Sequence, residues 1–329
     1  MIGKVTSSDL ARFVFPRLGA EDAEVIVGPR YGEDACAIDL GKKILVASTD
    51  PIIFAEDRIG KLGVNIACND VAASGAKPRW ILPVFFIPED SLDTLDKITR
   101  QVDEEAKKVG VAVVGGHSEI VPKIDRPLLT MTCLGIAERF VNSAGAEEGD
   151  LIIMTKSAGI EGAGIIATDF EKELKEKGIT RGEIESAKGL LDRISVVKDA
   201  LTLLKFSSSM HDPTEGGILA GAYEIAEASG VSFELWLEKI PVDEIVKKIC
   251  SAVGLDPLRI FASGALLATA PKDDAKLALK KLSAKGIEGR VIGRVKKGKG
   301  VILIRDGKKI EEIYNPEMVR DEMYNLWLS

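Results

Sequence analysis

The pattern of apolar and polar positions is clearest in the segment 60–78, which carries both at helical spacing. Leu62 and Ile66 share one face of a helix, whereas Asn65 and Asn69 lie four residues apart on another face. The residues between are small, so another backbone can come close, and a proline follows. The pattern predicts a helix with a polar edge. That edge either pins the helix to a neighbouring element or belongs to a functional site.

Apolar runs bounded by glycine, proline and acidic residues predict strands elsewhere in the chain. Pro83 indicates an edge strand or a bulge, and the run 111–114 reads as a buried strand that ends in a glycine pair. The predicted strands are 25–27, 35–38, 43–49, 80–87, 111–114, 127–137, 151–155, 231–235, 264–269, 289–295 and 301–304. Helices are predicted at 8–18, 91–110, 183–205, 218–229, 242–250 and 272–285.

The stretch 139–150 is rich in alanine, glycine and glutamate and lacks apolar periodicity, which favours a domain boundary. We therefore expect an N-terminal domain over 1–145 and a C-terminal domain over 146–329. Both domains mix strands with helices, so the fold class is expected to be α/β followed by α+β. A length of 329 residues is enough for two domains with cores of their own.

Composition narrows the class of protein. Apolar residues make up 46% and charged residues 29% of the chain, and no apolar run approaches the length of a membrane span, so we expect a cytoplasmic protein without a membrane partner. A formal charge of −7 argues against nucleic acid as a partner. The four cysteines are dispersed, which favours buried thiols over disulfides or a zinc site.

Polar residues recur at predicted strand ends and helix starts. Acidic residues at positions 34, 50, 70 and 212 and the two histidines, His117 and His211, make up this set, and both histidines stand close to a double glycine. Carboxylates that meet in one pocket suit Mg²⁺, which also takes substrate phosphates. The set therefore points to nucleoside triphosphate chemistry, although each acid alone could be a solvated loop residue or a cap.

Two glycine-rich turns precede predicted helices, at 159–164 and 212–217. A helix N-terminus favours an anion, and glycine clears space for one. The first turn has neither the dinucleotide-binding nor the P-loop spacing, so a plain tight turn is the simpler interpretation. No motif supports nucleophilic serine or cysteine catalysis.

Five motifs in order resemble the AIR synthase-related superfamily, which includes AIR synthase, thiamine monophosphate kinase, selenophosphate synthetase and the hydrogenase-maturation protein HypE. The resemblance covers nearly the whole chain. The motifs are Gly32-Glu-Asp-Ala35, Ser48-Thr-Asp-Pro51, Asn69-Asp-Val-Ala-Ala-Ser-Gly-Ala-Lys-Pro78, Gly115-Gly-His117 and His211-Asp-Pro-Thr-Glu-Gly-Gly217.

The resemblance implies a PurM-like two-domain fold, in which the N-terminal sheet forms a barrel across a homodimer and the C-terminal domain is α+β. It also implies ATP bound with Mg²⁺ and without a P-loop. The implied metal ligands are Asp34, Asp50 and Asp70. The implied cofactor-binding residues are Gly32, Glu33, Asp34, Thr49, Asn69, Gly115, Gly116, Thr214 and Gly216, and the implied catalytic residues are His117 and Asp212.

The motifs depart from the family at one point and leave the reaction open. Several relatives carry an acid where this chain has His117, which could be a metal ligand or a base, and Glu119 is a candidate replacement. The residues in these motifs are most similar to those of HypE. HypE, however, needs a C-terminal cysteine, and this sequence ends in Asn325-Leu-Trp-Leu-Ser329. We therefore expect HypE-like activation of a small amide or phosphorylated substrate by ATP, without HypE's own cysteine chemistry. The alternatives are a small-molecule kinase like thiamine monophosphate kinase, and a non-catalytic ATP-binding factor that docks another maturation protein.

Overall fold

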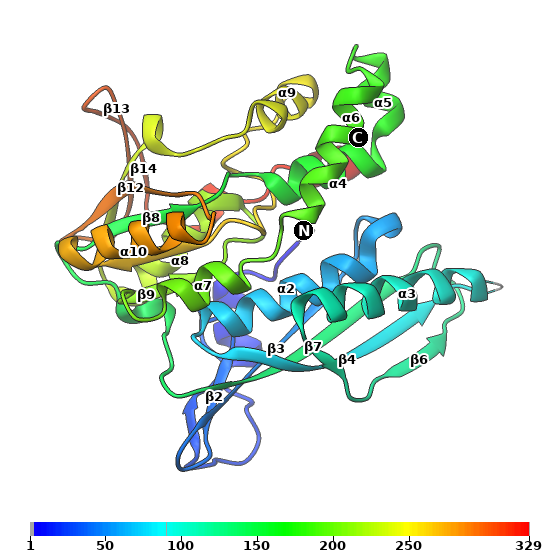
Figure 1. The fold of residues 1–329 in the computed structure, drawn as a ribbon, viewed down its shortest axis with the longest axis horizontal. Coiled ribbons are helices and arrows are strands. Elements are labelled where there is room, and N and C mark those ends of the chain that lie inside the picture. The colour runs from blue at the N-terminus through cyan, green and yellow to red at the C-terminus, as the bar shows by residue number, and fades with distance from the viewer. Residues whose placement is uncertain (1–2, 90, 329) are drawn as a thin grey trace.

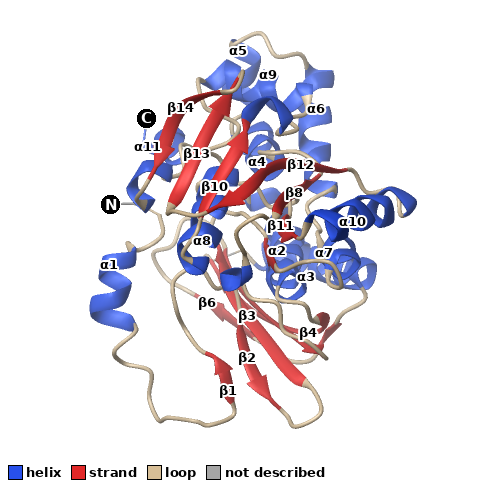
Figure 2. Ribbon diagram, turned by 90° about the vertical axis from the view of Figure 1, so that its left-hand side faces the viewer, coloured by secondary structure: helices blue, strands red, loops and turns tan. Residues whose placement is uncertain are grey.

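The computed structural model of the chain describes residues 3–89 and 91–328. Two mixed seven-stranded sheets form the framework, one above the other in Figure 2. Among the described residues, none of the helices combines the length and apolar character of a membrane span.

The first sheet has the strand order β1-β2-β3-β7-β4-β5, and β6 also pairs with β4. Its strands are β1 (Val25–Val27), β2 (Cys36–Asp39), β3 (Ile44–Ile52), β4 (Lys77–Ile87), β5 (Ala112–Val113), β6 (His117–Ile120) and β7 (Leu128–Ala137). Helices α2 (Ile59–Ala73) and α3 (Leu92–Val109) cover one face (Figure 1). The described strands form an open sheet, so closure into a barrel with a second copy stays a prediction.

The second sheet has the order β14-β13-β10-β12-β8-β11-β9. Its strands are β8 (Leu151–Thr155), β9 (Ser209–His211), β10 (Ser232–Trp236), β11 (Leu267–Ala270), β12 (Gly289–Lys296), β13 (Gly300–Arg305) and β14 (Lys308–Ile313). Side chains of β8 alternate between two clusters: Ile152 and Met154 pack with helix α8 (Gly217–Ser229), whereas Ile153 packs with α7 (Val197–Leu203) and α10 (Lys272–Ala284). The sheet is therefore covered on both faces at β8.

The remaining helices of the second half pack around α4 (Ile160–Asp169). They are α5 (Glu171–Glu176), α6 (Arg181–Lys188) and α9 (Glu244–Val253), at the upper right of Figure 1. Short pieces complete the chain: α1 (Ser7–Asp9), α11 (Tyr324–Leu328), a π-helical turn η1 (Leu10–Val14), and the 3-10 turns η2 (Glu56–Arg58), η3 (Ser143–Gly145), η4 (Gly189–Asp192), η5 (Leu237–Lys239) and η6 (Pro316–Val319).

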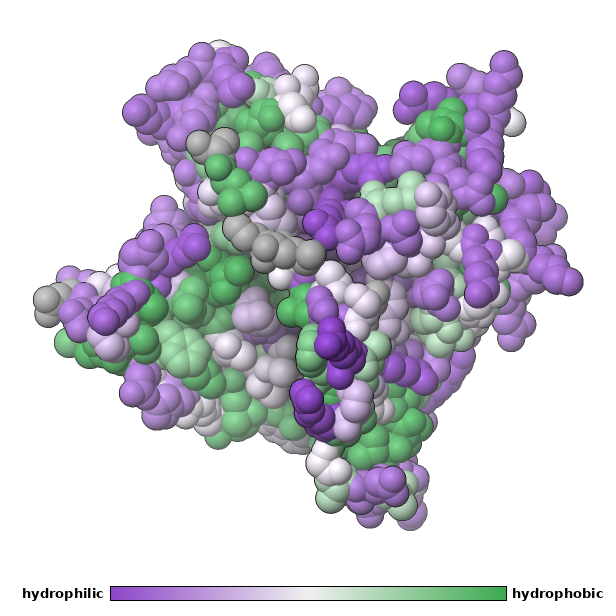
Figure 3. Space-filling view, turned by 180° about the vertical axis from the view of Figure 1, so that it is seen from behind, coloured by the Kyte–Doolittle hydropathy of each residue, from purple (hydrophilic) through white to green (hydrophobic). Residues whose placement is uncertain are grey.

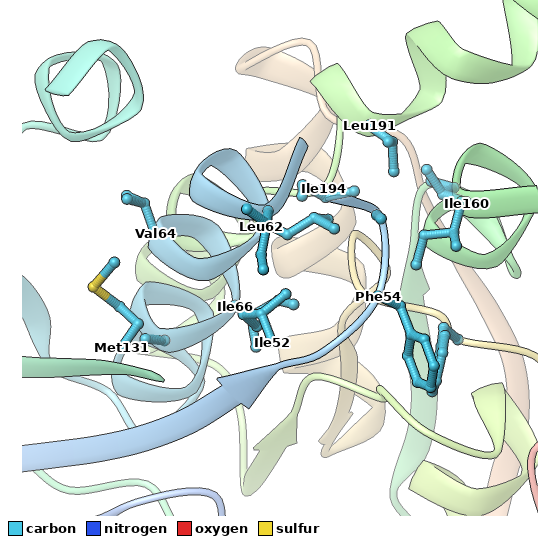
Figure 4. Close-up of a cluster of buried hydrophobic side chains, with 14 of the residues drawn as sticks. Ile52, Phe54, Leu62, Val64, Ile66, Met131, Ile160, Leu191 and Ile194 are labelled. Carbon is cyan, nitrogen blue, oxygen red and sulfur yellow. The ribbon is translucent and has the colours of Figure 1, made fainter. Parts of the chain in front are cut away.

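Helix α2 lies between the two halves of the molecule, the first formed by residues up to 137 with the first sheet and the second by residues from 151 with the second sheet. Every residue from Ile59 to Ala73 is buried, so the helix has no exposed polar edge. In Figure 4, Leu62 and Ile66 lie in one apolar cluster that also holds Ile160 and Leu191 of the second half. The small residues predicted to let another backbone approach therefore sit in a core shared by both halves.

Three predictions about local structure need correction. The run 111–114 was predicted as a buried strand, but only Ala112–Val113 is a strand and both residues are exposed, because β5 is an edge strand with few neighbours. The helix predicted at 8–18 is limited to α1 and η1. Pro83 lies on a strand with neighbours on both sides, yet β5 pairs with β4 before it and β6 pairs after it, so its missing N–H falls in the gap.

Candidate active site

A cavity of about 1110 Å³ is lined by both halves of the chain and by segments near both of its ends. Residues 28–36 and 47–50 form one side, and the second half contributes His211, Thr214 and Glu224. Residues 4–6 and 316–328 complete the wall. Of the predicted site residues, the cavity is lined by Gly32, Glu33, Asp34, Thr49, Asp50, Asp70, Thr214 and Gly216.

Two of the carboxylates meet at one hydroxyl group. Asp50 lies near the end of β3 and Asp70 on α2, and Ser48 Oγ donates at 2.6 Å to Asp70 Oδ2 and lies 3.3 Å from Asp50 Oδ2. Burial raises the pKa of Asp70 well above its usual value, and the charges of Asp50, Asp212 and Asp34 raise it further. The fold therefore holds like charges together in a place shielded from water.

His211 joins the first half of the site to the second. Its Nδ1 lies 2.8 Å from Asp34 Oδ2, and its Nε2 lies 2.9 Å from Glu224 Oε2 on α8. Burial lowers the pKa of His211, but the two carboxylates outweigh burial and raise it well above its usual value. An imidazolium held between two acids fixes the position of Asp34 relative to the second half.

Asp212 carries the clearest sign that a cation belongs here. Both of its oxygens are buried without a hydrogen-bond donor. Burial raises the pKa of Asp212, and the charge of Asp34 raises it further. Across the described residues, however, no three His, Cys, Asp or Glu side chains already stand in the geometry of a metal site. Carboxylate oxygens are the ligands that Mg²⁺ prefers, so this donor set fits that ion in kind.

The glycine-rich turn before α8 was predicted to leave backbone N–H groups for an anion, and here the structure differs. Gly216 N–H donates at 2.7 Å to Asp321 Oδ2, and Gly217 N–H donates to Thr214 O. Gly216 has φ +80°, and a Cβ there would lie 2.3 Å from Val319 O. Glycine is therefore required because residues 319–321 pass directly over the turn, and the carboxyl group of Asp321 accepts from the N–H of Gly216.

The other glycine-rich turn, at 159–164, is packed into the protein. A Cβ on Gly159 would meet Pro257 O at 2.9 Å, and Gly162 N–H donates to Phe261 O. The simpler interpretation, a tight turn that allows close packing, describes it.

Asp212 is not among the residues that line the cavity, and four further predicted site residues lie away from it. Asn69 is fully buried, its Nδ2 donates to Ile194 O at 2.9 Å, and its Oδ1 accepts from Val196 N–H at 2.8 Å. The structure thus uses Asn69 to fasten α2 to the second half. Residues 115–117 are exposed beside β4, and His117 Nε2 lies 2.8 Å from Glu119 Oε2. Within one chain, Gly115, Gly116 and His117 do not meet the carboxylates.

Other residues of the cavity wall escaped sequence reasoning. Ser48 precedes the Thr-Asp pair of its motif and could have been noticed there. Glu224 is an acid among apolar residues of α8, which is a weak signal for a buried partner. Lys4 carries no signal in the sequence, because its place depends on the path of the N-terminal segment across the cavity.

Comparison with known proteins agrees with this architecture. Residues 32–137 match the model of the AIR synthase related protein N-terminal domain, and residues 147–306 match that of the C-terminal domain. The chain is 32% identical over 279 residues to the carbamoyl dehydratase HypE of Cupriavidus necator, covering 81% of this chain and 77% of the relative. It is 29% identical over 316 residues to a putative hydrogenase expression/formation protein of Methanocaldococcus jannaschii, covering 92% and 91%.

Among solved structures, AaThiL complexed with AMPPCP and TMP superposes with a TM-score of 0.70 at 25% identity, covering 85% of this chain and 89% of that one. The two domain models, the HypE relative and this superposition point to the same fold. The chain belongs to the AIR synthase-related protein family.

Proposed function

We propose that the chain is an ATP- and Mg²⁺-dependent enzyme that transfers a phosphoryl group to a small substrate. The observation that carries the proposal is the meeting of Asp34, Asp50, Asp70 and Asp212, from both halves of the chain, in or beside one large cavity. A structural relative at 25% identity binds AMPPCP, a methylene analogue of ATP, which supports a nucleotide in this cavity.

The carboxylates of Asp34, Asp50 and Asp70 would hold Mg²⁺, which neutralises the charge of the phosphate chain when bound. Ser48 orients two of these acids, and His211 fixes the third. Gly32, Glu33, Thr49, Thr214 and Gly216 would line the nucleotide. Asp212 would lie beside the reacting group. In such a transfer the protein chiefly positions groups and balances charge, which suits a wall of fixed carboxylates.

A homodimer is part of the proposal because none of the described elements covers one face of the first sheet around β4. Trp80, Leu82, Val84 and Phe86 of β4 are only half buried there, and Figure 3 has a hydrophobic area over this part of the molecule at lower left. The sheets of two copies would close this face into the predicted barrel. Residues 115–117, exposed beside β4, would then lie at the interface, where His117 could reach the partner's cavity.

Light scattering tests the dimer. Val84→Asp should convert the protein to a monomer, because it puts a charge in the apolar face, whereas Leu277→Asp, at an exposed position of α10 outside the first sheet, serves as the comparison. A wild-type monomer at micromolar concentration would remove the dimer from the proposal.

The acceptor is proposed to be a small amide or phosphorylated compound, as in HypE-like activation. A screen of ADP release with carbamoyl, amide and hydroxyl compounds tests this. ADP and free phosphate without a phosphorylated product indicate activation followed by dehydration, and a stable phosphoester indicates a kinase. Binding of ATP without turnover in the presence of any compound or protein extract would favour the remaining candidate, an ATP-binding factor for another maturation protein, which the hydrogenase-related relatives support.

Asp70→Asn tests the carboxylate cluster directly. The variant should fold, since it removes a buried charge that its neighbours repel, and it should lose measurable Mg²⁺–ATP binding in calorimetry. Asp39→Asn, at an exposed position on β2, should bind as the wild type does. Unchanged affinity in the Asp70 variant would exclude a metal role for this residue.

A further inference from the structure

The N-terminal segment brings a lysine to the carboxylate cavity. Lys4 lines the cavity, its Nζ lies 3.4 Å from Thr214 Oγ1, and its backbone N–H donates at 2.9 Å to Glu215 Oε1. Both partners belong to the motif before α8, more than 200 residues away in the sequence. The segment is therefore docked on the site by specific contacts.

The docking depends on the residue before Lys4. Gly3 has φ +104°, and a Cβ there would lie 2.7 Å from Glu215 Oε1 and 2.8 Å from Tyr324 Cε2. Tyr324 OH also donates to Glu215 Oε2 at 3.0 Å. A side chain at Gly3 would push the segment off Glu215, so the backbone path that delivers Lys4 requires glycine.

The ammonium group of Lys4 faces acids of both halves. Lys4 is exposed as a residue, but its ammonium group lies in the cavity wall, where desolvation lowers its pKa; the charges of Glu224, Glu215, Asp34 and Asp50 outweigh this and raise the pKa, so the group keeps its positive charge. Within the described residues no carboxylate forms a direct ion pair with it, and its nearest polar contact is the Thr214 hydroxyl. The ammonium group thus lies near several carboxylates, but it is not neutralised by a direct ion pair with any carboxylate of the described residues.

The other basic side chains of the cavity wall are committed locally. Arg30 Nη2 lies 2.8 Å from Glu33 Oε1, and Arg320 Nη2 lies 2.6 Å from Glu317 Oε2. His211 is occupied between two acids. A phosphate chain that enters a wall of carboxylates needs positive charge beyond the metal, and Lys4 is positioned to supply it.

We propose that Lys4 is a further phosphate-binding residue of this site, whose ammonium group pairs with the phosphate chain of the nucleotide. This inference rests on the proposed function and adds a contact to it from outside the motifs. An ammonium group on a flexible stem binds phosphate as a point charge from a short distance. Glu215 holds the backbone N–H of Lys4 and so sets where the stem begins, and the bound phosphates would take the place of the weak contact between the ammonium group and the Thr214 hydroxyl.

Calorimetry with the full chain tests the inference, using Mg²⁺–ATP, Mg²⁺–ADP and AMP as probes. Lys4→Met should weaken ATP binding by about 10- to 100-fold, the range expected for loss of one charged contact, and should leave AMP binding unchanged. Lys4→Arg should keep most of the ATP affinity because it keeps the charge. Lys297→Met, in the exposed turn between β12 and β13, is the matched control.

A second titration separates a phosphate contact from a structural role. With Mn²⁺ alone, Lys4→Met should bind the ion more tightly than the wild type, because a repelling cation has been removed from beside the carboxylates. Weaker Mn²⁺ binding would mean that Lys4 merely holds the acids in place, and would overturn the inference.

The outcomes distinguish the inference from the function beneath it. Equal ATP affinity in wild type and Lys4→Met, or an equal loss for ATP and AMP, overturns the role of Lys4 and leaves the proposed function standing. A wild-type chain that binds none of the three nucleotides overturns both.

Discussion

Replacement of Asn69 by alanine should destabilise the protein and spare its nucleotide affinity. Asn69 is fully buried, and its amide pairs with Ile194 O and Val196 N–H, which are themselves in buried residues. Truncation leaves a donor and an acceptor without partners, each at about 1–3 kcal/mol. We therefore expect the free energy of unfolding to fall by about 2–6 kcal/mol, a large part of an ordinary protein's stability.

Urea unfolding followed by tryptophan fluorescence measures this loss. The matched comparison is Asn65→Ala, one turn earlier on α2, whose amide donates to Lys61 O and Glu105 Oε1 within the first half. Its Oδ1 already lacks a partner, so truncation should cost less, about 1–2 kcal/mol. Calorimetry with Mg²⁺–ATP at a temperature where both variants are folded completes the test. Wild-type stability together with lost ATP affinity in Asn69→Ala would refute the structural role and restore Asn69 to the site.

Three further changes test other parts of the structure. Burial raises the pKa of Asp321 to about 8, whereas the same carboxyl group in the unfolded chain releases its proton near pH 4. The stability that the bound proton contributes is therefore complete below about pH 4, declines as the pH rises, and is lost above about pH 8. Asp321→Asn should flatten this pH dependence of the melting temperature. Gly216→Ala should lower the free energy of unfolding in urea by more than about 3 kcal/mol, because its Cβ would clash with Val319 O. Gly254 also has a positive φ, +74°, but open space around it, so Gly254→Ala should lower it by only about 1–2 kcal/mol. Equal losses in the two variants would contradict the clash. Trp327→Ala should cost about 2–4 kcal/mol, since Trp327 stacks on Phe54 at 4.0 Å, and exposed Leu328→Ala should stay within about 0.5 kcal/mol of wild type.

Periodicity predicted the long elements of this fold well because each has many residues and a buried face. Strands β3, β4 and β7 and helices α3, α8 and α10 lie close to where apolar spacing put them. Short elements at the edge of a sheet were harder to predict. The run at 111–114 has the composition of a core strand, yet burial depends on which strands become its neighbours, and that is a property of topology.

The site residues also fall into those that the sequence could predict and those that it could not. Asp34, Asp50 and Asp70 could be grouped from their places at loops, strand ends and a helix, and the structure lines one cavity with them. Asn69 could not be sorted, because an amide that pins two elements and an amide that binds a ligand look the same in sequence. Lys4 and Glu224 are brought in by tertiary contacts alone, so no local pattern could reveal them.

The shared core around α2 limits how a ligand can enter. Enzymes that close by a hinge usually have two bodies joined by few contacts. Here one apolar cluster crosses from the first sheet to α4, and Asn69 bonds across the same boundary, so rotation of one half against the other would break close packing. Access should instead depend on local displacement of the largely exposed N-terminal segment, because Val319, Asp321 and Met323 of the C-terminal segment are buried. Hydrogen exchange should accordingly be faster in residues 3–6 than in α2 and in residues 319–324.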